Sequence, residues 1–153
     1  MNSIAKDLIL PFLPSALTIL GWWIVASRDG NSKKNTIHNK RVESASKLID
    51  KILLDAKKFY SLLGSDIETQ AMSHLIASDF KKLSSMITLI SKELGKAERL
   101  SLAIEFIEYK KIVTGGEFGT ISRMPIASSN QLYIDIDTAY DSLYMELEKS
   151  YLI

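Results

Sequence analysis

Cysteine is absent from the chain, and histidine occurs only twice, as His38 and His74. The absence of cysteine excludes disulfides, zinc thiolates and thiol nucleophiles. Two histidines are too few for a histidine-rich metal cage. No nucleophile–base pair, pair of acids or metal-ligand spacing stands out in the remaining sequence. We therefore expect that the protein is not an enzyme and uses no cofactor.

Charge is absent from Leu8 to Ser27, a run of twenty residues. A helix of that length covers about 30 Å, which is the thickness of the hydrocarbon core of a bilayer. Trp22 and Trp23 favour the membrane–water interface. We interpret residues 1–27 as a transmembrane segment. A cleaved signal peptide and a buried helix of a soluble protein are the alternatives, but the apolar run exceeds a typical signal core and its two prolines fit a membrane better.

Basic residues follow this segment, whereas only Lys6 precedes it. The positive-inside rule therefore places the C-terminal part in the cytoplasm and the N-terminus outside, in a single-pass protein of the cell inner membrane. A basic collar next to a span also suits contact with anionic lipid. The collar consists of Arg28, Lys33, Lys34, Lys40 and Arg41.

Small and weakly polar residues recur at three- and four-residue intervals within the apolar run, so they share one side of a helix. Small residues let transmembrane helices approach closely, and serine or threonine can hydrogen-bond between helices. This stripe predicts self-association, and the alternative is an ordinary membrane anchor. Its members are Pro11, Pro14, Ser15, Thr18, Gly21 and Trp22.

The remaining chain predicts an all-α fold. Residues 28–35 are expected to form a polar linker broken by Gly30, and residues 36–153 a cytoplasmic helical domain. Helical periodicity predicts four helices, joined by short turns into an elongated antiparallel bundle. Their expected bounds are Thr36–Leu63, Asp66–Leu94, Lys96–Val113, and Ser128 or Ser129 to the end.

Local signals add detail to these helices. Gly64 should end the first helix by adopting a positive φ. Ser65 and Glu68 form a capping-box pattern that opens the second helix. The third helix is expected to bury an apolar face made of Leu100, Ala103, Ile104, Ile107 and Val113.

Two candidate sites lie in the C-terminal half. Four tyrosines share one side of the last helix, and they suit a protein interface, base stacking or simply the rim of the core. These are Tyr133, Tyr140, Tyr144 and Tyr151. The loop with Gly115, Gly116 and Arg123 is a candidate anion site, because glycine-rich backbone can present N–H groups to an anion. Glycine-rich turns are also common as plain connectors.

The segment Gly21-Trp22-Trp23-Ile24-Val25, followed by a basic run and a short helical domain without cysteine, resembles small single-span effectors of bacterial anti-phage defence. The membrane effector of Hailong-type systems is the family that it resembles most. That resemblance implies an oligomeric, channel-like protein held inactive by an oligonucleotide that a partner nucleotidyltransferase makes. It covers the architecture and transfers no functional residues.

Together these features predict an oligomeric single-span effector that disrupts membrane integrity and is controlled by its helical domain. Its expected partners are membrane lipid, further copies of the chain and a nucleotide or oligonucleotide ligand. The alternative is a membrane-anchored scaffold that recruits a cytoplasmic protein partner.

Overall fold

The computed structural model describes the backbone of residues 13–152 and the side chains of residues 32–152. In this part of the chain all regular structure is helical, which confirms the all-α prediction. The helices are α2 (Leu13–Ser61), α3 (Ile67–Ser91), α4 (Lys96–Thr114) and α5 (Gln131–Lys149). The chain divides into two compact units, Met1–Ile37 and His38–Ile153.

The predicted membrane span, Leu8–Ser27, lies largely outside what the structure describes. Residues 8–12 are not described, and no side chain of residues 13–31 is described. Among the described residues, no helix has both the length and the apolar character that crossing a bilayer requires. The transmembrane segment and its small-residue stripe therefore stay predictions.

The expected linker at residues 28–35 is corrected by the structure, because α2 includes all of these residues. Gly30 is the only strong helix breaker in the segment, and a glycine inside a helix costs about 1 kcal/mol relative to alanine. Unlike proline, glycine keeps its backbone N–H and creates no steric clash. The Thr36 hydroxyl donates to the carbonyl of Ser32, four residues earlier, which is a common contact of threonine inside a helix.

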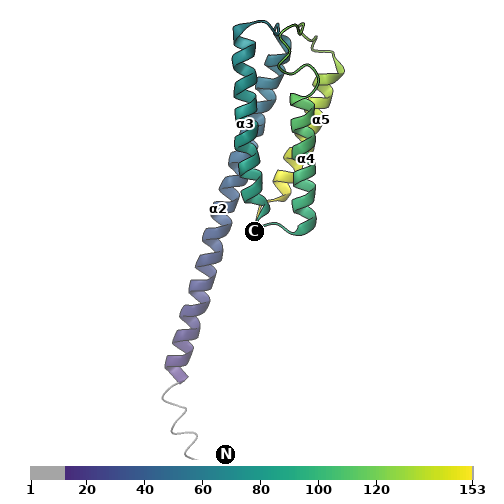
Figure 1. The fold of residues 1–153 in the computed structure, drawn as a ribbon. Coiled ribbons are helices and arrows are strands. Elements are labelled where there is room, and N and C mark those ends of the chain that lie inside the picture. The colour runs from purple at the N-terminus through teal and green to yellow at the C-terminus, as the bar shows by residue number, and fades with distance from the viewer. Residues whose placement is uncertain (1–12, 153) are drawn as a thin grey trace, which may run out of the picture. The chain divides into compact units, whose positions relative to one another are not determined.

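In the second unit, the helices alternate in direction and form an antiparallel four-helix bundle (Figure 1). The chain enters this unit at His38 on α2. Because the directions alternate, α3 ends, α4 begins and α5 ends at the same end of the bundle. We call this the His38 end. Residues 115–130 form the irregular connection at the other end.

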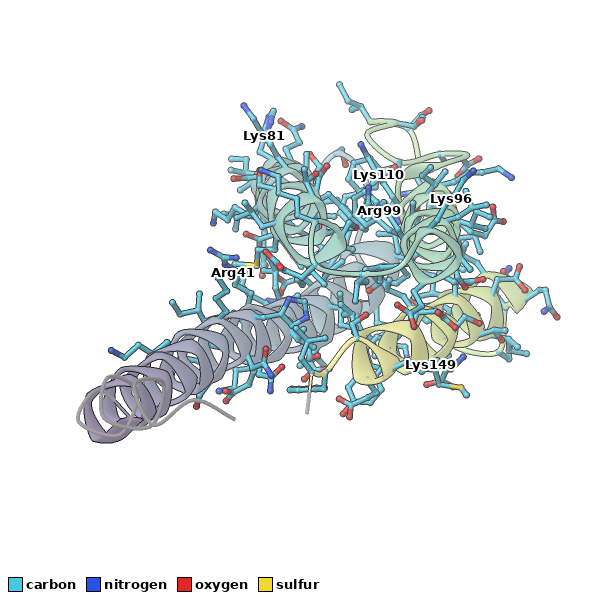
Figure 2. The ribbon with its side chains drawn as sticks, turned by 90° about the horizontal axis from the view of Figure 1, so that it is seen from below. Arg41, Lys81, Lys96, Arg99, Lys110 and Lys149 are labelled. Atoms are coloured by element: carbon cyan, nitrogen blue, oxygen red, sulfur yellow. The ribbon has the colours of Figure 1, made fainter. Side chains whose placement is uncertain are left out.

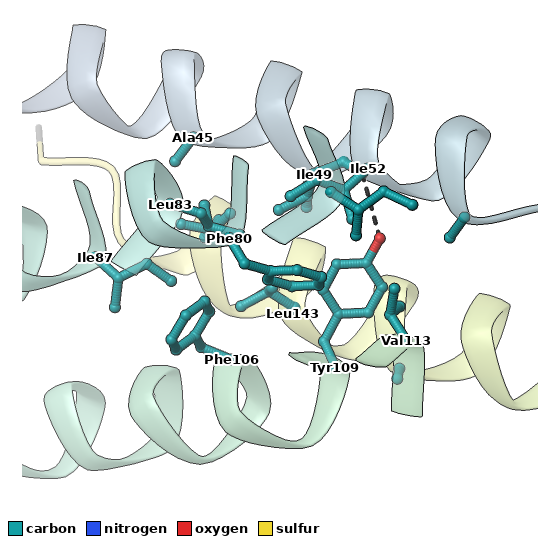
Figure 3. Close-up of a cluster of buried hydrophobic side chains, with 14 of the residues drawn as sticks. Ala45, Ile49, Ile52, Phe80, Leu83, Ile87, Phe106, Tyr109, Val113 and Leu143 are labelled. Atoms are coloured by element: carbon teal, nitrogen blue, oxygen red, sulfur yellow. Dashed lines mark hydrogen bonds between the residues drawn. The ribbon is translucent and has the colours of Figure 1, made fainter. Parts of the chain in front are cut away.

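The core lies between all four helices and is built from aliphatic side chains around stacked rings (Figure 3). The ring of Phe80 on α3 lies 6.4 Å from that of Phe106 and 5.6 Å from that of Tyr109, both on α4. The Tyr109 hydroxyl donates to the carbonyl of Ile49 at 3.4 Å. This bond satisfies the one polar group that the buried tyrosine brings into the core.

The prediction for the buried face of α4 is wrong except at Val113. The residues that α4 buries are Leu102, Phe106, Tyr109 and Val113. By contrast, Leu100, Ile104 and Ile107 are 62%, 53% and 61% exposed. The helix carries two apolar stripes, and the core takes the one with the aromatic rings because those rings bury more surface.

Two predicted end signals are also corrected. Asp66 is the N-cap of α3 and makes no side-chain cap bond, while the Glu68 carboxylate instead binds Lys58. Helix α2 ends at Ser61, and Gly64 is not among the glycines with positive φ. A Cβ atom at Gly64 would collide with the backbone oxygen of Thr120, so a close approach of two chain segments requires this glycine.

Candidate anion-binding face

A groove of about 410 Å³ runs between α3 and α4 on the surface of the bundle. Its floor is apolar, and hydroxyl and cationic groups stand at its edges. The lining residues are Ser84, Ile87, Thr88, Ser91, Lys92, Arg99, Ala103, Phe106 and Ile107. A groove of this composition suits a partner with an apolar side and negative charge.

Cations gather around this groove from both helices. At 100° per residue, Lys96, Arg99 and Lys110 fall within about 60° of one another on α4, and Lys81 and Lys92 nearly coincide on α3. Figure 2, a view along the bundle, shows Lys81 on α3 on the same side as the labelled cations of α4. We call these five residues the basic face. All five are exposed.

The carboxylates of α4 lie away from the basic face, and the exposed Glu93 lies in the turn between Lys92 and Lys96. The acids of α4, among them Glu105 and Glu108, lie on the side of that helix nearer α5, about 120° or more from Lys96. Within the described part of the chain, none of the five cations forms an ion pair. The Arg99 guanidinium is held in place by donating to the carbonyl of Leu94 at 3.2 Å. The face therefore keeps its positive charge available to a partner.

The tyrosines of α5 turn toward α2 rather than away from the bundle. The Tyr133 hydroxyl donates to the carbonyls of Lys57 and Ile126, both at 3.3 Å, and Tyr140 donates to the Asp50 carboxylate at 2.6 Å. Burial, followed by this bond to a carboxylate, raises the pKa of Tyr140 well above its ordinary value.

The other two tyrosines complete that arrangement. The Tyr144 ring lies 5.9 Å from the Tyr140 ring, and Tyr151 is 37% exposed. Tyr133, Tyr140 and Tyr144 are partly buried and pack against the core. This placement favours the interpretation that the tyrosines form the rim of the core.

Arg123 of the candidate anion loop is buried and points into the bundle. Its two terminal nitrogens donate to the carbonyls of Tyr60 at 3.2 Å and Phe59 at 2.8 Å. Its guanidinium carbon lies 4.4 Å from the centre of the Phe59 ring. These contacts engage both terminal nitrogens, and the remaining Nε is buried, so the geometry gives Arg123 a structural role.

The glycines of the same loop face a second cavity, of about 360 Å³, on the α4–α5 side. Gly115 and Gly116 line it together with the carboxyl-bearing residues Glu108, Glu117 and Asp135. Three carboxyl groups disfavour an anion here by like-charge repulsion. Only Lys111 brings a positive charge to the lining.

The basic collar is placed only in part. Lys33, Lys34 and Lys40 are exposed and Arg41 is half-buried, while the side chain of Arg28 lies outside the described residues. Lys40 and Arg41 belong to the His38 end of the bundle. The collar residues Lys40 and Arg41 and three members of the basic face, Lys92, Lys96 and Arg99, therefore lie at this end of the bundle.

The basic face was not predicted from the sequence. The signal was available, because helical projections of residues 66–94 and 96–113 each place all unpaired cations on one side. What the projections lack is the rotation of each helix about its axis, which the core sets. The buried face predicted for α4 was wrong, and a helix rotated to bury that face would not bring its cations next to those of α3.

The described residues contain no cluster of three or more histidine or carboxylate groups that could hold a metal ion. No family model, curated protein or solved structure matches the chain.

Proposed function

We propose that the protein is a membrane-tethered, self-associating effector that compromises membrane integrity and is controlled through its helical bundle. The basic face is the observation that supports this proposal. It joins five exposed cations without ion pairs to an apolar groove, which is the character of a recognition surface rather than of a neutral solvated face. The uncharged run at Leu8–Ser27 supplies the membrane segment.

The control element in this proposal is an anionic partner bound at the basic face. Lysine and arginine side chains attract phosphates and carboxylates alike. The resemblance to Hailong-type effectors implies a nucleotide or oligonucleotide ligand, which belongs to the proposal without being placed at the basic face. Lipid contact is assigned to the collar, because its cations follow the membrane segment in the chain.

Ion release from liposomes tests the proposed function. Full-length protein reconstituted into liposomes should release a trapped ion, and a variant with Gly21→Leu and Thr18→Leu in the predicted stripe should release less. The leucine variant must still be recovered in the liposomes, which makes it a control for insertion. Wild-type liposomes that stay sealed would rule out the effector function.

The scaffold alternative rests on the same basic face, with an acidic cytoplasmic protein as the ligand. It predicts that full-length protein in sealed, non-leaking liposomes retains such a partner. It also predicts that reversing charges on the basic face releases that partner while leaving the protein in the membrane.

A further inference from the structure

An exposed apolar ridge runs along α4 beside the basic face. Leu100, Ile104 and Ile107 form this α4 ridge at four- and three-residue spacing, and each is more than half exposed. Apolar side chains repeated in this way are typical of the surface on which another helix packs. Within the described part of the chain, no helix covers them.

A second exposed ridge, on α5, has the opposite charge. Its residues fall within about 80° of one another on the side of α5 that faces away from the core. Ile134 and Met145 are 55% and 59% exposed, and Asp141 and Glu148 add two carboxylates without any cation between them. The α5 ridge consists of Ile134, Thr138, Asp141, Met145 and Glu148.

The two ridges match in height at one pair of apolar positions, whereas Ile104 on α4 lies level with Asp141 on α5, both about 12 Å from the His38 end. Counted at 1.5 Å per residue from the His38 end, Leu100 on α4 and Met145 on α5 both lie about 6 Å along their helices. Ile107 and Thr138 both lie about 16 Å along. Two copies of the bundle that stand level and parallel therefore bring these positions face to face.

The charges match in the same register. Glu148 lies about 2 Å from the His38 end, between the heights of Lys96 and Arg99. Asp141 lies at about 12 Å and Lys81 of α3 at about 15 Å. Each carboxylate of the α5 ridge thus meets cations of the basic face at its own level, which is the pattern of electrostatic complementarity.

We propose that the α5 ridge of one copy docks against the α4 ridge and basic face of a second copy, with both bundles parallel and level. This deepens the proposed function and rests on it, since a shared membrane holds the copies with their His38 ends at one height. The two ridges lie on different faces, so the contact is heterologous and can repeat around a ring.

The basic face fits an acidic helix better than a single-stranded nucleic acid. Binding of single strands relies on aromatic side chains that stack on the bases. Among the described residues of the groove, the only aromatic one is Phe106, which is 9% exposed. The exposed apolar groups are aliphatic, and they suit the apolar stripe of a helix.

The proposed interface is narrow, with a few apolar side chains on each side. Its stability therefore depends on the copies being held close together in one membrane. Tethering to one membrane raises the effective concentration of the partner and favours contacts that are weak between free molecules. The proposal therefore concerns the full-length protein in a membrane or detergent.

Site-specific disulfides test the contact directly, because the natural chain has no cysteine. Ile107→Cys and Thr138→Cys are prepared separately, mixed in detergent, reconstituted together and oxidised. The mixture should form a crosslinked dimer that neither variant forms alone. Ser78→Cys, on the exposed side of α3 outside the groove, replaces Ile107→Cys in the control mixture and should give no dimer.

The crosslinking outcomes separate the possibilities. Dimers from Ile107→Cys alone would indicate a two-fold contact through α4 and would overturn the proposal, as would the absence of dimers in the mixture. Because crosslinking needs no ion flux, a crosslinked but non-leaking protein would refute the effector function alone. Leaking liposomes without the crosslink would refute only this interface.

Charge exchange gives an independent test. Lys96→Glu with Arg99→Glu, and separately Asp141→Lys with Glu148→Lys, should each lose the oligomeric mass in detergent. Mixing the two variants should restore it, which also shows that both are folded. Leu54→Glu with Ala71→Glu adds two charges at exposed positions outside both ridges and the basic face and should associate like the wild type. Unchanged association of either reversed variant would contradict the proposal, and so would tighter binding of a short oligonucleotide than of the α5 ridge at the basic face.

Discussion

Arg123 is the largest of the fully buried side chains and joins the irregular segment to the end of α2. It satisfies carbonyls that the last turn of a helix leaves without helical partners. It also stacks on the Phe59 ring and lies near the Tyr60 ring. Burial raises the pKa of Tyr60 to about 12, although the Arg123 charge acts in the other direction. Tyr60 therefore stays neutral at physiological pH.

Arg123→Ala should lower the free energy of unfolding by about 3 kcal/mol, since it removes two buried hydrogen bonds to the carbonyls of Phe59 and Tyr60 and removes packing from two rings. Denaturant unfolding followed by circular dichroism measures this loss. Lys81→Ala, at an exposed site without an ion pair, is the matched control and should change stability by less than about 0.5 kcal/mol. A loss below that level for Arg123→Ala would contradict the structural role.

Asp79 is a buried carboxylate on α3 that binds Lys51 and Lys82. Burial raises its pKa, but the hydrogen bonds and charges of the two lysines outweigh burial and hold the pKa below its ordinary value. Because the pKa of Asp79 is lower in the folded than in the unfolded state, its ionised form stabilises the fold at pH values above the unfolded pKa. That contribution is lost as the pH falls through the native value.

Asp79→Asn should therefore cost about 1 kcal/mol at neutral pH, where the charged hydrogen bonds are complete. The difference from the wild type should shrink as the pH falls below about 4, because the wild-type carboxyl then becomes protonated too. Unfolding measured at a series of pH values checks this trend. A difference in unfolding free energy between wild type and Asp79→Asn that grows as the pH falls would contradict the lowered pKa of Asp79.

At the scale of the elements, the segment after α5 binds the first turn of the bundle at its His38 end. His38 donates from Nε2 to the carbonyl of Ser150 at 2.7 Å, and its side chain is buried. Asn39 and Leu152 exchange two hydrogen bonds, each of 2.9 Å, between the amide side chain and the backbone. These bonds hold residues 150–152 against α2.

Asn39→Ala should release this segment locally, because it removes both bonds to Leu152 at a cost of about 1 kcal/mol each. Hydrogen exchange should become faster at Tyr151 and Leu152 and stay unchanged in the core helix α4. Ser44→Ala, which removes an exposed hydroxyl from the outer side of α2, serves as the control. Equal protection of residues 151 and 152 in wild type and Asn39→Ala would contradict the contact.

The sequence predicted helices more reliably than it predicted which side each helix buries. In α5 the periodic residues Ile136, Ala139, Leu143 and Leu147 form one stripe, and all four are buried. In α4 two apolar stripes compete, and only the packing of Phe106 and Tyr109 against Phe80 decides between them. Gly30 shows the limit of another local rule, since a glycine without a neighbouring proline does not end a helix.

The candidate site was harder to predict for the same reason. The basic face combines residues of two helices, so its formation depends on how both are rotated in the bundle. Arg123 was a candidate ligand for an anion, yet it is buried because two helix-end carbonyls and an aromatic ring receive it. Contacts of this kind join positions about sixty residues apart, and no local pattern encodes them.

At the scale of the whole molecule, the proposed membrane segment, which lies largely outside the described residues, precedes a bundle with a basic face and an α5 ridge of opposite charge. Exposed charges at such a contact are screened by salt, with a Debye length of about 10 Å at 0.1 M and about 3 Å at 1 M. Self-association of the full-length protein in detergent should therefore weaken as salt rises. Association that strengthens with salt would indicate a purely apolar contact instead.

The mass of the full-length protein in detergent, measured by light scattering with the bound detergent subtracted, tests the central claim of a self-associating membrane effector most directly. The account predicts a defined mass several times that of one chain, which decreases when the charges of the basic face or of the α5 ridge are reversed. A strictly monomeric protein across the accessible concentration range would contradict it.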